Sequence, residues 1–136
     1  MLCIYCGSDT KVINSRPQKR ANRIWRRRTC MTCGTTFTSI ETIDLAGSIR
    51  VRDAAKALEP FQRDKLFMSV YDSLKHRKAA LTDATGLTDT VISKLLPYMK
   101  DAVLYKAAIT RETIDTLKRF DKIAATHYEA FHPEKK

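Results

Sequence analysis

The chain has 136 residues, of which 43% are hydrophobic and 29% are charged, as in folded globular proteins. No stretch reaches the roughly 18 apolar residues that a membrane span needs, and no apolar segment follows Met1, so we expect neither a membrane nor a secreted protein. The 25 lysines and arginines outnumber the 15 acids, and the resulting charge of +10 indicates an anionic partner.

This positive charge is concentrated at the start of the chain. Residues 1–40 hold eight cations, one acid and all four cysteines, whereas helix-patterned sequence begins only near Ile49. The composition changes across Thr42–Ser48, which we interpret as a short linker. The sequence therefore predicts a basic cysteine-bearing unit over residues 1–42 and a helical unit over 48–136.

The cysteines form two Cys-x-x-Cys pairs with 23 residues between them, and each pair is followed by a glycine. Four thiolates at this spacing suit one tetrahedral Zn²⁺ per chain, which would replace the core that so short a segment cannot build. Disulfides, thioredoxin-like redox chemistry and an iron–sulfur cluster are the weaker alternatives. The predicted ligands, in a ribbon with strands near residues 11–13, 24–25 and 35–40, are Cys3, Cys6, Cys30 and Cys33.

Between the two cysteine pairs, seven cations fall within residues 16–28, around the single tryptophan of the chain. Guanidinium groups match phosphate geometry, so this density favours nucleic-acid binding over a merely solvated basic surface. If residues 24–28 form a strand, Trp25 and Arg27 lie on one face, and Arg26 and Arg28 on the other. Trp25 then stacks on a base, enters a groove or packs beside the metal site. The candidate DNA-binding residues are Arg16, Arg23, Trp25, Arg26, Arg27 and Arg28.

The rest of the chain predicts a strand near residues 49–52 and then three helices. The first covers about 62–77, the second begins at Thr88 as its N-cap and ends near Pro97, and the third runs from Thr110 to about Phe131. The apolar stripe of the third helix predicts its core residues: Ile114, Leu117, Phe120, Ala124, Tyr128 and Phe131. Lys65 falls in the first turn of its helix, where a cation is unfavourable unless an anion joins it.

These motifs together resemble the NrdR family, bacterial transcriptional repressors of ribonucleotide reductase genes. The resemblance rests on the cysteine pairs and on residues 9–16, 26–30 and 37–41, and the helical part is similar to the family's ATP-cone at 51–52, 59–66 and 117–124. It implies a zinc ribbon that contacts double-stranded DNA and a cone that binds ATP or dATP. It also implies a homo-oligomer, acting at the nucleoid in the cytoplasm.

Carried over by position, the resemblance assigns the four cysteines to zinc and residues 26–28 to DNA. The chain departs from the family in several places: Trp25 replaces the first residue of what resembles a four-arginine run, residues 53–58 lack a turn glycine and are one longer, Lys78 replaces a proline, and the acidic and aromatic tail is missing. Arg52 also stands where lysine is usual. The nucleotide-contacting residues implied in this way are Val51, Arg52, Glu59, Lys65, His76 and Arg77.

We therefore expect an α+β protein, with a small zinc ribbon followed by a mainly helical ATP-cone that includes a short β-hairpin. The resemblance implies a nucleotide-sensing repressor. We do not expect an enzyme, because the sequence offers no catalytic constellation, and the missing P-loop excludes nucleotide binding of that type. The alternative is a zinc-ribbon RNA-binding or ribosome-associated protein whose helical part is a docking module.

Overall fold

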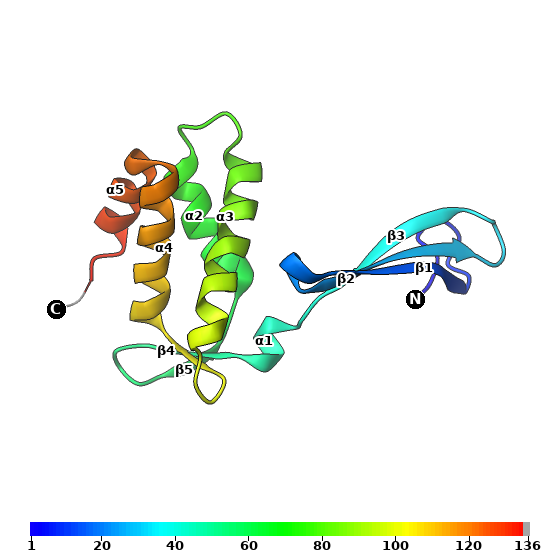
Figure 1. Ribbon diagram of the computed structural model, residues 1–136, viewed down its shortest axis with the longest axis horizontal. Coiled ribbons are helices and arrows are strands. Elements are labelled where there is room, and N and C mark those ends of the chain that lie inside the picture. Colours follow the sequence, from blue (N-terminus) through cyan, green and yellow to red (C-terminus); the bar gives the residue numbers. More distant parts are fainter. Residues whose placement is uncertain (135–136) are drawn as a thin grey trace. The chain divides into compact units, whose positions relative to one another are not determined.

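The computed structural model describes residues 1–134 (Figure 1). They form two compact units, Met1–Ile43 and a second unit that begins at Asp44. The first is built of strands and the second mainly of helices, so the α+β class is confirmed. None of the helices described in residues 1–134 is long and apolar enough to cross a bilayer.

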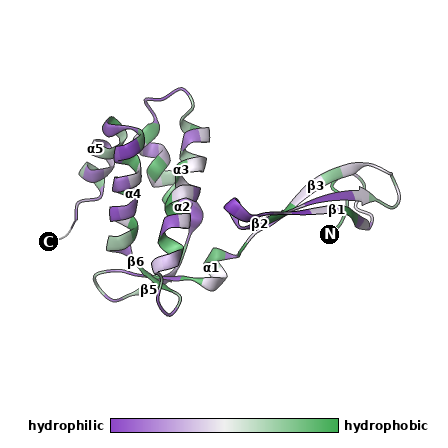
Figure 2. Cartoon of the chain, in the orientation of Figure 1, coloured by the Kyte–Doolittle hydropathy of each residue, from purple (hydrophilic) through white to green (hydrophobic). Residues whose placement is uncertain are grey.

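The first unit is a three-stranded antiparallel sheet in the order β1-β2-β3. A 3-10 turn at Lys19–Ala21 joins the first two strands, and Asn22 completes it with a φ of 47°. This turn is among the most hydrophilic parts of the unit (Figure 2). The pairing register shifts between Val12 and Asn14, where β1 carries a bulge. The strands are β1 (Thr10–Gln18), β2 (Arg23–Cys30) and β3 (Thr36–Glu41).

The second unit packs four helices beside a small sheet in the order β5-β4-β6. β4 and β5 form the expected hairpin, and β6 adds a parallel strand on the other side of β4. The strands are β4 (Arg50–Arg52), β5 (Leu58–Pro60) and β6 (Val103–Tyr105). The helices are α2 (Arg63–Leu74), α3 (Ala80–Leu95), α4 (Lys106–Phe120) and α5 (Lys122–Phe131), with a short α1 (Leu45–Ser48) before them.

The apolar core lies entirely within the second unit. It runs from Ile49 in front of β4 to Tyr128 in α5, with Val70, Leu74 and Leu117 almost fully buried. In the first unit, among hydrophobic side chains, only Cys3, Cys30 and Phe37 are buried. A sheet with so small a core needs another source of stability.

The predicted linker was wrong in part, because residues 45–48 form the short helix α1. The carboxylate of Asp44 caps it by accepting a hydrogen bond of 3.0 Å from the amide of Gly47. The composition of this segment resembles that of a linker, but an Asp followed by small residues is also a helix start.

The predicted start of the second helix at Thr88 was also wrong, since α3 begins at Ala80. Thr88 is fully buried, and its hydroxyl donates to the carbonyl of Ala84, one turn earlier. The Thr-Asp pair imitates a helix start, but tertiary packing carries the helix two turns further back.

The predicted third helix is in fact two helices, separated at Asp121. The Asp121 carboxylate accepts hydrogen bonds from the amides of Ile123 and Ala124 and so begins α5. Because the chain turns there, Phe120 and Phe131 leave the predicted core stripe and are 42% and 71% exposed.

Candidate functional site

The four cysteine sulfurs meet at one end of the β1-β2-β3 sheet, all within 4.8 Å of one another. Sγ of Cys3 lies 3.8 Å from Sγ of Cys33, and Sγ of Cys6 lies 3.4 Å from Sγ of Cys30. A zinc ion bound to four thiolates at about 2.3 Å would hold them about 3.8 Å apart in a tetrahedron. The sulfur positions therefore fit a closed structural Zn²⁺ site with one ligand from each cysteine.

Backbone amides turn toward these sulfurs and favour their ionised form. The amide of Tyr5 donates to Sγ of Cys3, and the amides of Thr32 and Cys33 donate to Sγ of Cys30, each over 3.4 Å. The hydrogen bond from Tyr5 lowers the pKa of Cys3. Hydrogen bonds from the side chain and backbone of Ser8 lower the pKa of Cys6 to about 6. For Cys30 the two amides also lower the pKa, but burial and the neighbouring thiols Cys6 and Cys33 outweigh them and raise it. Thiolates are the form that binds metal, so the backbone prepares Cys3 and Cys6 for zinc.

The predicted placement of the arginines on β2 is confirmed by the strand register. Arg27 donates to the hydroxyls of Thr36 and Thr38 on β3, over 2.8 and 3.3 Å. Arg26, on the opposite face, lies 2.9 Å from the Glu41 carboxylate.

The remaining contacts of β2 show which face of the sheet each side chain occupies. Arg26 also donates to the hydroxyl of Ser15, and Arg28 to that of Ser39, so both stay on their own face. Trp25 is half-buried and pairs with Arg16 on β1 and Ile40 on β3. The six candidate DNA-binding residues therefore do not lie on one surface.

In the second unit, four of the six candidate nucleotide contacts lie together around the hairpin and the first turn of α2. Val51 pairs with Glu59 across β4 and β5, and the Lys65 ammonium lies 3.1 Å from the Glu59 carboxylate. Arg52 is opposite Leu58 in the register, and its Nε is buried without a hydrogen-bond partner among the described residues. A buried donor of this kind is costly unless an acceptor arrives.

His76 and Arg77 do not join that group. They follow the C-terminal end of α2, whose 12 residues extend for about 18 Å. There, Nε2 of His76 lies 2.9 Å and Nη1 of Arg77 lies 3.1 Å from the carboxylate of Asp121. The structure thus gives both side chains a partner that ties the α2–α3 loop to the start of α5.

A groove of about 590 Å³ lies between α2 and α5 and includes Lys65. Its other basic residues, Lys75, His127 and His132, were missed by the sequence analysis. The rings of His127 and Phe131 are tilted by 34° with their centroids 4.7 Å apart, so the groove has an aromatic wall. The available signal was that two of the chain's three histidines, His127 and His132, fall near its C-terminal end.

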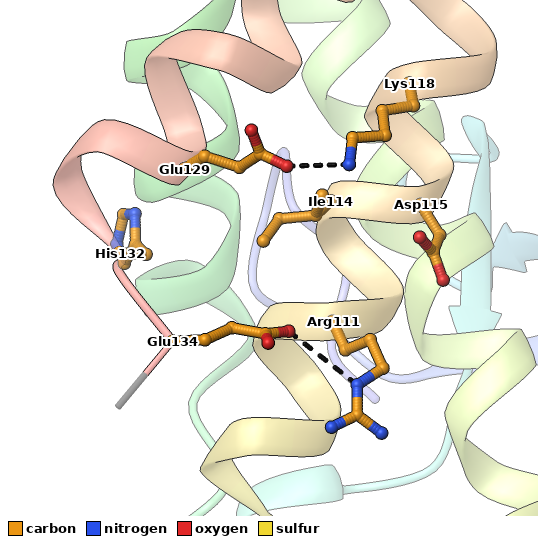
Figure 3. A pocket seen from close by; sticks show the side chains of 7 residues that line it. All are labelled: Arg111, Ile114, Asp115, Lys118, Glu129, His132 and Glu134. Carbon is orange, nitrogen blue, oxygen red and sulfur yellow. Dashed lines mark ion pairs between the residues drawn. The ribbon is translucent and has the colours of Figure 1, made fainter. Parts of the chain in front are cut away.

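A smaller groove of about 350 Å³ lies between α4 and α5 (Figure 3). Its charges are paired across the opening: the Lys118 ammonium lies 2.7 Å from the Glu129 carboxylate, and Nε of Arg111 lies 3.7 Å from that of Glu134. Three carboxylates line this groove, those of Asp115, Glu129 and Glu134, whereas the groove between α2 and α5 has one, that of Asp72, which is paired with Lys75. The groove between α4 and α5 is therefore the poorer site for an anion.

The turn between β4 and β5 contains no glycine. Lys56 takes the left-handed position, with a φ of 63°. Asp53 holds the turn, because its carboxylate accepts from the Ala57 amide over 3.0 Å. The longer turn is therefore an ordered one.

Comparisons with known proteins identify the family. Residues 1–41 match the family described as "Transcriptional repressor NrdR-like, N-terminal domain". The chain is 31% identical to the protein named transcriptional repressor NrdR of Methylacidiphilum infernorum, over 99% of this chain and 83% of that one. The repressor of the same name from Azorhizobium caulinodans is 34% identical, over 97% and 76%. That of Symbiobacterium thermophilum is 28% identical, over 98% and 88%. The resemblance found in the sequence is confirmed, and the chain belongs to the NrdR family of transcriptional repressors.

Proposed function

We propose that this chain is a repressor that binds double-stranded DNA through residues 1–42 and senses ATP or dATP through residues 48–136. Its proposed targets are ribonucleotide reductase genes, and its place of action is the nucleoid in the cytoplasm. Membership of a family of named transcriptional repressors supports a regulatory role over an enzymatic one.

The observation that carries the DNA-binding half is the arginine-rich sheet attached to the thiolate cluster. Each phosphate neutralised by a lysine or arginine releases a condensed counterion, which makes such a sheet a strong electrostatic ligand for a duplex. A bound Zn²⁺ would be held by Cys3, Cys6, Cys30 and Cys33 and would keep the strands in register. Few side chains of one such ribbon can reach bases at once, so we propose that chains act as a homo-oligomer.

The nucleotide-binding half rests on the chemistry of the groove between α2 and α5. Lys65 has one carboxylate partner in an exposed pair, so its ammonium is available to a triphosphate at little cost. The aromatic pair of His127 and Phe131 offers a surface on which a base can stack. Arg52 does not line this groove but lies on β4, and its unpartnered Nε needs an acceptor, which a phosphate oxygen would supply.

Among the nucleotide contacts implied by the family, we therefore propose that Val51, Arg52, Glu59 and Lys65 contact the nucleotide directly. His76 and Arg77 act in this proposal through Asp121, by holding the far end of the groove's two helices together. A nucleotide would then shift the helical unit between two states by binding one of them more tightly.

The experiment combines DNA binding with size measurement on the full chain. Duplexes from upstream of ribonucleotide reductase genes are compared with scrambled duplexes and with RNA of the same sequence, without nucleotide and with ATP or dATP. We expect preference for the reductase duplexes and a change of both affinity and oligomer size between ATP and dATP. Equal affinity in all nucleotide states would remove the regulatory half, and preference for RNA would favour the alternative of an RNA-binding protein.

A further inference from the structure

The two faces of the β1-β2-β3 sheet differ in charge. Residues directly opposite each other in an antiparallel sheet share a face, and neighbours along a strand alternate, so the register assigns each paired side chain to a face. The face that carries Trp25, here called the tryptophan face, holds four cations and no acid: Lys11, Arg16, Arg23 and Arg27. The opposite face holds two cations and one acid: Arg26, Arg28 and Glu41.

The hydrogen bonds increase the difference in charge between the two faces. On the opposite face, the Arg26 guanidinium is paired with the Glu41 carboxylate over 2.9 Å. That face also carries Phe37, which is only 7% exposed and belongs to the small interior of the ribbon. On the tryptophan face, the hydrogen bonds of Arg23 and Arg27 go to the neutral side chains of Gln18, Thr36 and Thr38, so their charge is not cancelled.

Trp25 lies at the centre of the cations on its face. Arg16 and Ile40 flank it on the neighbouring strands, and Arg23 and Arg27 are two residues away on its own strand. We infer that the tryptophan face is the surface that contacts double-stranded DNA, with Trp25 touching bases or sugars and the cations around it touching phosphates. This inference rests on the proposed DNA-binding function and names the face and the central contact.

The chemistry of the two kinds of side chain fits this division of roles. Guanidinium groups and ammonium groups at the border of the face match the phosphates, which position a protein on a duplex without reading its sequence. An indole ring beside the aliphatic Ile40 offers an apolar surface and one N–H donor to the groove. Arg26 and Arg28 are then positioning residues, which hold β1, β2 and β3 together through Ser15, Ser39 and Glu41.

The test uses charge-matched variants of the full zinc-loaded chain and a short duplex of arbitrary sequence, which needs no knowledge of the operator. Arg16→Gln and Arg27→Gln each remove one charge from the tryptophan face, and Arg28→Gln removes one from the opposite face. We expect the first two to weaken binding about tenfold and to lower the salt slope by about one, and Arg28→Gln to change affinity less than about threefold. Zinc content and circular dichroism check that each variant is folded, and Arg26→Gln is a second variant of the opposite face.

The single tryptophan provides an independent measurement, because all indole fluorescence of the chain comes from Trp25. Binding should quench this emission and protect it from acrylamide, and Trp25→Phe should weaken binding while zinc content stays the same. Equal losses from both faces, or emission that does not change on binding, would overturn the inference. Failure of the proposed regulatory function would look different: a duplex would still bind through the tryptophan face, but without preference for reductase genes and without a nucleotide response.

Discussion

The guanidinium of Arg77 lies 3.1 Å from the carboxylate of Asp121, and the same guanidinium lies 2.9 Å from the carboxylate of Asp83. One side chain after α2 therefore reaches the first turn of α3 and the residue between α4 and α5. The Arg77 guanidinium also lies over the ring of Phe120, 4.6 Å from its centroid. The helical unit is thus fastened at this end by polar contacts as well as by its core.

Asp121 should stabilise the helical unit in two ways, as the cap of α5 and as the partner of two basic side chains, and two substitutions can separate them. Asp121→Ala removes both the helix cap and the ion pairs, whereas Asp121→Asn keeps a side-chain oxygen that can cap α5. We expect Asp121→Ala to lower the free energy of unfolding by about 1 kcal/mol more than Asp121→Asn does, because this is the usual contribution of a cap. Chemical denaturation followed by circular dichroism measures the difference, and equal values for both variants would show that the cap contributes nothing.

The same carboxylate should make the stability of the helical unit depend on pH. The hydrogen bond from His76, with those from the amide of Ala124 and from Arg77, holds the pKa of Asp121 well below its usual range. A group whose pKa is lower in the folded state contributes stability above its unfolded pKa, about 3.9 for Asp, and loses it as the pH falls further. We therefore expect stability to fall below about pH 4, and to fall less steeply in Asp121→Asn.

Removal of the metal should unfold the ribbon and spare the helical unit. The ribbon buries little besides Phe37 and two of its own cysteines, whereas the core of the helical unit contains no residue of the ribbon. A strong chelator, or Cys30→Ser, should therefore abolish the strand signals and DNA binding, while the helical circular dichroism and the binding of ATP or dATP remain. Loss of the helical signal at the same chelator concentration would contradict this independence of the two units.

The ribbon was predictable because its determinants are local. The two Cys-x-x-Cys pairs mark its metal site, and the alternation of side chains along residues 24–28 gives the faces of β2 correctly. The helix boundaries were harder to predict from the sequence. Asp121 is a residue type that caps helices, but it lies in the middle of a sequence with continuous helical periodicity, and that periodicity favours one uninterrupted helix.

Long-range pairing was the other feature that the sequence did not reveal. β6 has only three residues and exists because Leu104 lies beside Val51 in a parallel register, a contact between segments more than 50 residues apart. Likewise, Lys75 and His127 meet in one groove only because α2 packs beside α5. Such sites depend on tertiary structure, for which a single sequence carries no signal.

Lys65 offers a direct test of the groove between α2 and α5. Because its pair with Glu59 is exposed, Lys65→Ala should leave the melting temperature nearly unchanged while it weakens ATP and dATP binding at least tenfold. Lys118→Ala is the matched control, since it removes an ammonium from the groove between α4 and α5, and it should leave nucleotide affinity intact. Calorimetric titration of both variants decides between the grooves, and the reverse pattern would place the nucleotide between α4 and α5.

Two glycines should respond in opposite ways to the same substitution. Gly86 lies in the interior of α3, is exposed and has nothing within 4 Å of the position that a Cβ would take, so alanine fits there. Gly86→Ala should stabilise the helical unit by about 0.5 to 1 kcal/mol, because alanine loses less backbone freedom in a helix than glycine does.

Gly34 has equally open surroundings, but its φ of 71° closes the second cysteine pair in a conformation that alanine disfavours by about 1 kcal/mol or more. Gly34→Ala should therefore weaken zinc binding without any steric clash, and thermal melting of the helical unit should be unaffected. Competition with a zinc chelator measures the first effect and calorimetry the second. If Gly34→Ala bound zinc as tightly as the unchanged chain, the left-handed turn would not be what shapes the metal site.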